Sequence, residues 1–327
     1  MALGYNRVLG DERLPVEARP HRVAIASWPT NVDDPRTRTL EALVGHVAAA
    51  GYEGCEFGLV TLSRFYEDES PAVVARKGRR VIEGAGLRVF GTAMHFLDEQ
   101  MRRRDWLDTA VEQMKSVVDL GGEYVTYQLY IHPDHANSGG AYREDERYLQ
   151  WCADRVAELR DAAWAEGLNF YLEVHVDRIT EDPAALCRLL ELAACELNGD
   201  MSHYLARGFE RGEHVEKVIR YVEHTHVRMA RKYGDLSAAV TDPQADWAAR
   251  GVTWKMFQFM KPALAGGLSS RAICGETGPM HLVTDTLTQD ATLVPLYRAM
   301  ARFADASAQG IAIKVEDPDD LNPWHEQ

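Results

Sequence analysis

The strongest constraint in the sequence is an alternation between short apolar runs typical of β-strands and longer stretches with helical periodicity. Eight such runs occur, at residues 22–28, 54–58, 88–95, 124–130, 169–175, 195–200, 224–230 and 272–276. Strands that alternate with helices form parallel sheets, and eight strand–helix units are the number that closes a (β/α)8 barrel. We therefore predict an α/β fold, a TIM barrel, with an open doubly wound sheet as the alternative.

The stretches between the runs carry the signals of helix ends. We expect helices over residues 40–49, 71–83, 106–120, 145–166, 184–194 and 287–306. Proline follows Ser70 and Asp182, at positions typical of a first helical turn. Gly51 and Gly86 stand between a helix and the next strand, as helix C-caps do. No G-x-G-x-x-G motif follows a strand, which argues against a dinucleotide-binding open sheet.

The length of 327 residues is compatible with a single α/β barrel. We expect residues 22–327 to form one catalytic barrel and the polar, proline-containing residues 1–21 to form an N-terminal arm. Two connections exceed what a minimal barrel needs, 132–144 after the fourth strand and 231–271 after the seventh. Both follow the carboxyl ends of strands, so we expect long loops at the catalytic face, either as decoration or as a lid or partner surface.

Charge and composition exclude several classes of protein. Asp and Glu number 50 against 36 Lys and Arg, a net charge of −14, which argues against nucleic-acid binding. The sequence has no apolar run of membrane-spanning length and no apolar segment near its start typical of a secretory signal. The five cysteines are scattered, with no C-x-x-C pair, as in proteins that keep their thiols reduced. We expect a cytoplasmic protein that binds neither nucleic acid nor membranes.

Polar side chains collect at the ends of the last four predicted strands. They are Glu173 and His175, Asp200 and His203, His224, His226 and Arg228, and Glu276. Each one alone could be a surface, turn or structural residue. In a barrel, however, these strand ends converge on one axis, and buried unpaired carboxylates are costly. A bound divalent cation would offset the free-energy cost of burying these carboxylates.

The candidate metal ligands are three carboxylates and one imidazole: Glu173, Asp200, Glu276 and His226. This oxygen-rich set suits Mn²⁺ or Mg²⁺, with Co²⁺ or Zn²⁺ as alternatives, and we expect Mn²⁺. Side chains alternate along a strand, so Glu173 and His175 point the same way. One of the pair can therefore bind the metal while the other contacts the substrate.

Four segments, L-E-V-H, D-M-S-H, H-T-H-V-R and G-E-T-G-P, resemble the xylose isomerase-like TIM barrels, the sugar isomerase/epimerase superfamily. The resemblance spans about residues 22–279. It implies that the same four candidate residues bind a divalent metal, often Mn²⁺. It also implies that His203 contacts the substrate, and that Arg228 or Arg231 anchors it.

His175 departs from many epimerases of this family, which lack a histidine after the strand-five glutamate. Together with the two long loops, it makes the chain similar to the large subunit of bacterial C-glycoside deglycosidases. Those enzymes act on 3-keto C-glycosides and pair with a small β-sheet subunit. The resemblance implies a sugar or glycoside substrate and a hetero-oligomer.

The chemistry expected of such a site begins with removal of a proton from a carbon next to a carbonyl, with a metal stabilising the enediolate. His175 is the expected base, and Glu173 and Glu276 are the alternatives. His95 or His132 is the candidate acid for a leaving aryl group. In the aromatic-rich segment 231–271, Trp254 is the candidate contact for a flat substrate.

The fate of the enediolate distinguishes the possible enzymes. Expulsion of the group one carbon further on gives a carbon–carbon lyase acting on a 3-keto C-glycoside, which is our prediction. Return of the proton gives a ketose 3-epimerase or an aldose–ketose isomerase, the alternative. A metal-dependent nuclease is disfavoured by the charge of −14, and a non-catalytic scaffold by the full ligand set.

Overall fold

The computed structural model describes residues 20–26, 34–56, 59–66, 69–94, 96, 98–129, 141–209, 211–234, 238, 240–276 and 286–324. All but two residues of the predicted N-terminal arm lie outside these ranges. Within them, no helix combines the length and the apolar character needed to cross a bilayer. All five cysteines are buried and free.

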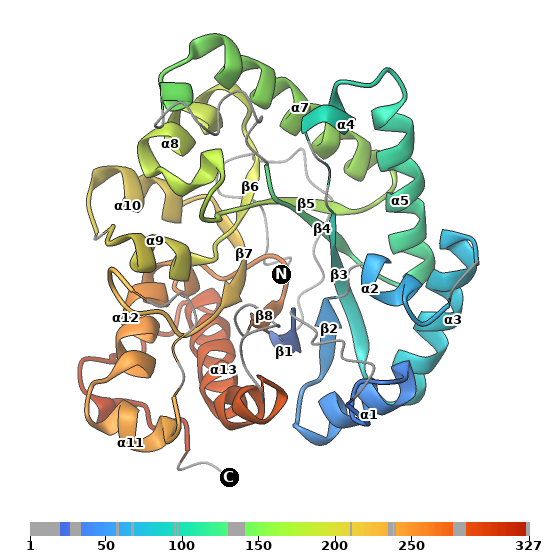
Figure 1. The fold of residues 1–327 in the computed structure, drawn as a ribbon. Coiled ribbons are helices and arrows are strands. Elements are labelled where there is room, and N and C mark those ends of the chain that lie inside the picture. The colour runs from blue at the N-terminus through green and yellow to red at the C-terminus, as the bar shows by residue number, and fades with distance from the viewer. Residues whose placement is uncertain are drawn as a thin grey trace.

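Eight parallel strands close into a barrel in chain order, with β8 paired to β1 (Figure 1). They are β1 (Arg22–Ile25), β2 (Gly54–Glu56), β3 (Arg88–Met94), β4 (Tyr124–Tyr127), β5 (Asn169–Glu173), β6 (Glu196–Asn198), β7 (Val222–Val227) and β8 (Ala272–Gly275). The predicted TIM barrel is confirmed, and all eight predicted strands are present. The seventh strand begins two residues earlier than expected.

Helices surround the barrel on the outside (Figure 1). In the described residues they are α1 (Leu40–Ala49), α2 (Leu59–Ser63), α3 (Pro71–Gly84), α4 (Asp98–Met101), α5 (Trp106–Leu120), α7 (Glu146–Ala165), α8 (Pro183–Leu192), α9 (Met201–Arg207), α10 (Glu213–Ile219), α11 (Pro243–Ala248), α12 (Val252–Leu264) and α13 (Thr286–Ala308). The cap signals explain several boundaries. The Asp182 carboxylate accepts the N–H groups of Ala184 and Ala185, and Gly121 ends α5 with a φ of 93°.

The long connection after β7 differs from the loop that we expected. It contains α11 and α12, and its aromatic side chains form part of the outer helical layer. Trp247 packs edge-on against Trp254 with ring centroids 4.9 Å apart, and Phe257 lies against both. We expected these aromatic residues in a loop, but they lie on helices and their rings are buried where the helices pack. The connection after β4 lies largely outside the described residues.

Side chains inside the barrel alternate with side chains that face the helices. On β5, Phe170 and Leu172 belong to the large apolar cluster, whereas Tyr171 belongs to a small inner one. The inner cluster consists of Ala24, Phe90, Tyr124, Tyr171, Ala272 and Cys274, with Ala26 against it. Because the strand repeat is two residues, Glu173 lies on the same side of β5 as Tyr171. The barrel axis thus carries aromatic rings and, beyond them, polar side chains.

A close contact inside the barrel gives a testable prediction. A Cβ atom added at Gly91 would lie 2.1 Å from the Tyr124 ring. We expect Gly91→Ala to lower the free energy of unfolding by about 1–3 kcal/mol, measured by urea denaturation, because the ring has to move. At Gly84, the last residue of α3, an added Cβ meets no atom within 4 Å. Gly84→Ala should therefore leave stability unchanged or raise it slightly, and equal losses in both variants would contradict this explanation.

Candidate metal and active site

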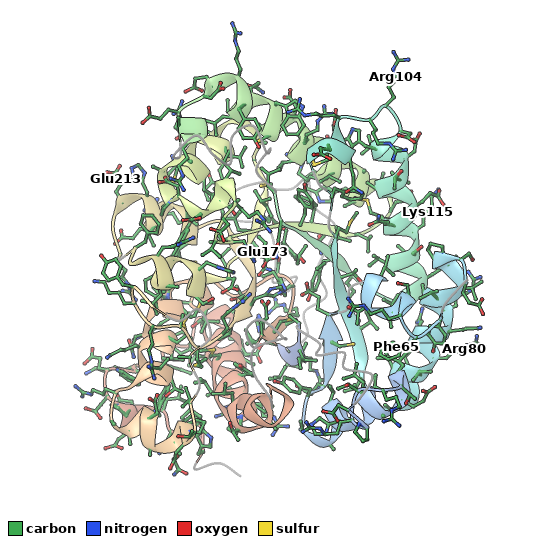
Figure 2. The ribbon with its side chains drawn as sticks, in the orientation of Figure 1. Phe65, Arg80, Arg104, Lys115, Glu173 and Glu213 are labelled. Carbon is green, nitrogen blue, oxygen red and sulfur yellow. The ribbon has the colours of Figure 1, made fainter. Side chains whose placement is uncertain are left out.

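Four of the predicted site residues come together at the carboxyl ends of the strands. Glu173 ends β5, Asp200 follows β6, His226 lies on β7 and Glu276 follows β8. One donor atom from each lies within 4.8 Å of the donor atoms of the others. Figure 2 shows Glu173 near the middle of the barrel, whereas Arg104, Lys115 and Glu213 lie at its outer edge. We call these four residues the acidic cluster.

Three residues of the acidic cluster are buried, and the fourth is more exposed. Asp200 is 0% exposed, Glu173 1% and His226 4%. The side chain of Glu276, by contrast, is 17% exposed. A small molecule would therefore approach the cluster from the side of Glu276.

Arg228 binds two members of the acidic cluster. Its Nη2 lies 2.8 Å from Asp200 Oδ2 and 2.6 Å from Glu276 Oε1, and its Nε donates to the same Asp200 oxygen over 2.8 Å. Burial alone would lower the pKa of Arg228, but the Asp200 and Glu276 carboxylates raise it. The guanidinium thus offsets one of the three negative charges of the cluster.

His226 lies between carboxylates on both sides of its ring. Nδ1 is 3.0 Å from Glu276 Oε2 and 3.7 Å from Glu173 Oε1, and Nε2 is 3.0 Å from Glu56 Oε2. Burial alone would lower the pKa of His226, but these carboxylates, Glu56 foremost, hold it well above its usual range. In turn, although burial opposes the shift, His226 lowers the pKa of Glu173 to about 2.

Three atoms of the acidic cluster face one another as ion-pair contacts at 3.0 and 3.7 Å, but none makes a well-formed hydrogen bond among the described residues. They are Glu173 Oε1, His226 Nδ1 and Glu276 Oε2. Buried polar atoms without partners are rare in folded proteins, because leaving them unpaired costs free energy. A cation coordinated by these atoms would remove that cost. The donor set of three carboxylates and one imidazole fits a divalent metal, and it does not by itself select one ion.

The remaining oxygens of the cluster are held by neutral donors. Gln128 Nε2 donates to Glu173 Oε2 over 3.1 Å. Asp200 Oδ1 accepts the N–H and the hydroxyl of Ser202, and so caps the N-terminus of α9. These bonds fix the orientation of both carboxylates, so that Glu173 Oε1 faces His226 and Asp200 Oδ2 faces Arg228 and His203.

Two further histidines lie against each other beside the cluster, with their rings tilted by 40°. The rings of His175 and His203 are 4.1 Å apart. His175 Nδ1 lies 2.6 Å from the Val176 carbonyl, which accepts its proton, so Nε2 is the nitrogen with a free lone pair. Burial, and next to it His203, lowers the pKa of His175. His175 is therefore favoured in the neutral form that can accept a proton.

His203 is fully buried, with both ring nitrogens close to polar groups. The Val176 N–H donates to its Nδ1 over 3.1 Å, and its Nε2 lies 3.1 Å from Asp200 Oδ2. The donated backbone hydrogen identifies Nε2 as the protonated nitrogen, directed at Asp200. The ring therefore orients that carboxylate.

Of the other predicted site residues, the structure describes Arg231 and Trp254. Arg231 is exposed. Trp254 lies on α12 against Trp247, and its ring contacts in the described part of the chain are with the outer aromatic layer. His95 and His132, the candidate acids, lie outside the described residues.

Sequence analysis missed Glu56, the last residue of β2. Its carboxylate is 1% exposed and hydrogen-bonds to His226 and His224. A charged residue in the short run G-C-E-F-G was the available signal. Gln128, just beyond β4, was also missed, because an isolated amide at a strand end resembles any loop residue.

Comparison with known proteins agrees with this architecture. A family model described as xylose isomerase-like TIM barrel matches residues 44–243. A xylose isomerase-like TIM barrel protein from Mycobacterium smegmatis, solved in complex with magnesium, is 16% identical with a TM-score of 0.58, over 88% of this chain and 98% of that one.

Two further structures are similar in fold. The 3-keto-D-glucoside 4-epimerase of E. coli is 13% identical with a TM-score of 0.56, over 85% of this chain and 99% of that one. A probable 3-DHS dehydratase from Bacillus anthracis is 12% identical with a TM-score of 0.55, over 84% and 98% of the two chains. Comparison with curated protein sequences gave no match. Since the family model covers more than half of its length, the chain belongs to the xylose isomerase-like TIM-barrel family.

Proposed function

We propose that this protein is a divalent-metal-dependent enzyme that removes a proton from the carbon next to a ketone of a sugar, and that it cleaves a 3-keto C-glycoside by elimination. The observation that carries the proposal is the acidic cluster, three of whose buried atoms lack partners, beside a histidine with a free nitrogen. Mn²⁺ is the metal that we propose. The resemblance to deglycosidases adds a small β-sheet subunit as the proposed partner.

Each residue of the site has its own role in the proposed reaction. A divalent ion held by the acidic cluster supplies a Lewis acid for the ketone oxygen. His175 Nε2 takes the proton from the carbon between the ketone and the carbon that carries the aryl group. The electron pair of that C–H bond forms a new carbon–carbon double bond, while the bond to the aryl group breaks. The aryl carbon leaves with its electron pair and takes a proton from an acid, for which His95 and His132 are the candidates.

An epimerase or isomerase is the second candidate. The same first step leads to epimerisation when a second base on the opposite face returns the proton. Glu173 and Glu276 lie near each other within the acidic cluster and could act in this way. Epimerisation and dehydration, named in two similar structures, are both outcomes that an enolate allows.

Metal binding is the first test of the proposal. Mn²⁺ at about a hundred times its Kd should raise the free energy of unfolding by about 2.7 kcal/mol, and a chelator should reverse this. Glu173→Gln should abolish the increase, because it removes a charged donor from the cluster. Glu213→Gln, at an exposed site on α10, is the matched control and should retain it. An undiminished increase in Glu173→Gln would reject the metal site.

Substrate assays distinguish the two candidates. The Mn²⁺-loaded protein, alone and with its co-purified partner, is incubated with a 3-keto C-glycoside or with a panel of ketoses and aldoses. We expect release of the free aglycone, detected by chromatography and mass spectrometry. Interconversion of the sugars without aglycone release would instead favour the epimerase or isomerase.

The role of His175 is tested by His175→Gln. Turnover should fall by about 10²–10⁴-fold, the usual contribution of a general base, while Mn²⁺ affinity stays at the wild-type value. His214→Gln changes an exposed histidine on α10 and should have no effect on either quantity. Turnover that survives in His175→Gln would assign the base to another residue.

A further inference from the structure

Glu56 is a buried carboxylate to which the proposed reaction gives no role. It ends β2, and its side chain is surrounded by polar groups from β4 and β7. A carboxylate kept charged inside a barrel costs desolvation free energy, so its surroundings have to compensate for that cost.

Four donors converge on this one carboxylate. Thr126 Oγ1 donates to Oε1 over 2.9 Å, and the Tyr124 hydroxyl donates to Oε2 over 3.2 Å. His224 Nε2 and His226 Nε2 each lie 3.0 Å from the same Oε2. The carboxylate accepts hydrogen bonds from both hydroxyls, and an unprotonated imidazole nitrogen at 3.0 Å would face one of its oxygens lone pair to lone pair, so both of these nitrogens carry a proton.

The proton on Nε2 determines what the other side of the His226 ring can do. With Nε2 protonated, Nδ1 is the nitrogen that would give up its proton and offer a lone pair when a metal binds. Nδ1 is also the atom that faces Glu276 and Glu173 and lacks a hydrogen-bond partner in the described structure. Glu56 therefore stands behind the ring, on the side opposite to the acidic cluster.

We propose that Glu56 is a positioning residue that fixes the tautomer and ring orientation of His226 and strengthens it as a metal ligand. A carboxylate behind a metal-bound imidazole raises the basicity of the ligand nitrogen, and loss of such a partner commonly weakens metal binding 10–100-fold. This inference rests on the metal site of the proposed function. It adds a residue that never touches the ion.

A second cation between Glu56, His224 and His226 is the competing interpretation, because their donor atoms also lie within 4.8 Å of one another. The hydrogen bonds disfavour it. Both imidazole nitrogens already direct protons at Glu56, and the other nitrogen of His224 lies 3.0 Å from Ser270 Oγ. The His224 ring also packs 4.5 Å from the Tyr124 ring, which leaves the group closely surrounded.

The test compares metal affinities of Glu56→Gln and wild type. Co²⁺ and Mg²⁺ are titrated separately into chelator-treated protein, because Co²⁺ gains more than Mg²⁺ from an imidazole ligand. We expect the Kd for Co²⁺ to rise about 10–100-fold, and the Kd for Mg²⁺ to rise less. Thr126→Val, which removes a different hydrogen bond to the same carboxylate, is the matched control and should bind both ions as wild type does.

Thermal melting of the metal-free proteins separates positioning from a general structural role. Glu56→Asp keeps the buried charge but withdraws the carboxylate by one methylene group, so it supplies the measurement if the glutamine variant does not fold. We expect Glu56→Asp, like Glu56→Gln, to lose more affinity for Co²⁺ than for Mg²⁺. Unchanged Co²⁺ affinity, equal losses for both ions with a lowered melting temperature, or two bound ions per wild-type chain would each overturn the inference. Wild-type protein that binds no metal would instead reject the proposed function itself, and this inference with it.

Discussion

The repulsion between carboxylates that the barrel forces together is the interaction on which the rest of the site depends. Parallel strands that close into a barrel bring their carboxyl ends to one axis, and here three of those ends supply Glu173, Asp200 and Glu276. Burial shields the charges of Glu173 and Asp200 from water. Arg228 and His226 provide compensating charge from neighbouring positions, and Glu173 Oε1, His226 Nδ1 and Glu276 Oε2 face one another where we propose that a cation binds.

The polar interior is built in successive levels along the barrel axis. Tyr124 and Tyr171 pack with ring centroids 5.3 Å apart, and His224 lies against both. Glu56 is connected to this level through Tyr124 and to the next through His226. A substitution at Tyr124 can therefore affect His226 of the acidic cluster through hydrogen bonds to Glu56.

The fold could be predicted from the sequence alone, because periodicity and cap residues depend on local structure. The eight strands and the helix boundaries at Asp182 and Gly121 follow from such local signals. The candidate cluster was also predictable, because its residues occur at the ends of successive strands. Glu56 was not, since its importance depends on contact with His226, which is 170 residues away in the chain. The packing of Trp254 was not predictable for the same reason: the burial of an aromatic ring depends on how helices pack.

Asp200 serves the fold as well as the acidic cluster. One of its oxygens caps α9, and the other lies within bonding distance of both Arg228 and His203. Since Arg228 also neutralises Glu276, the mouth of the barrel has internal counter-charges of its own. Part of the repulsion between the carboxylates at this end of the barrel is thus offset by a side chain of the protein itself, before any ion binds.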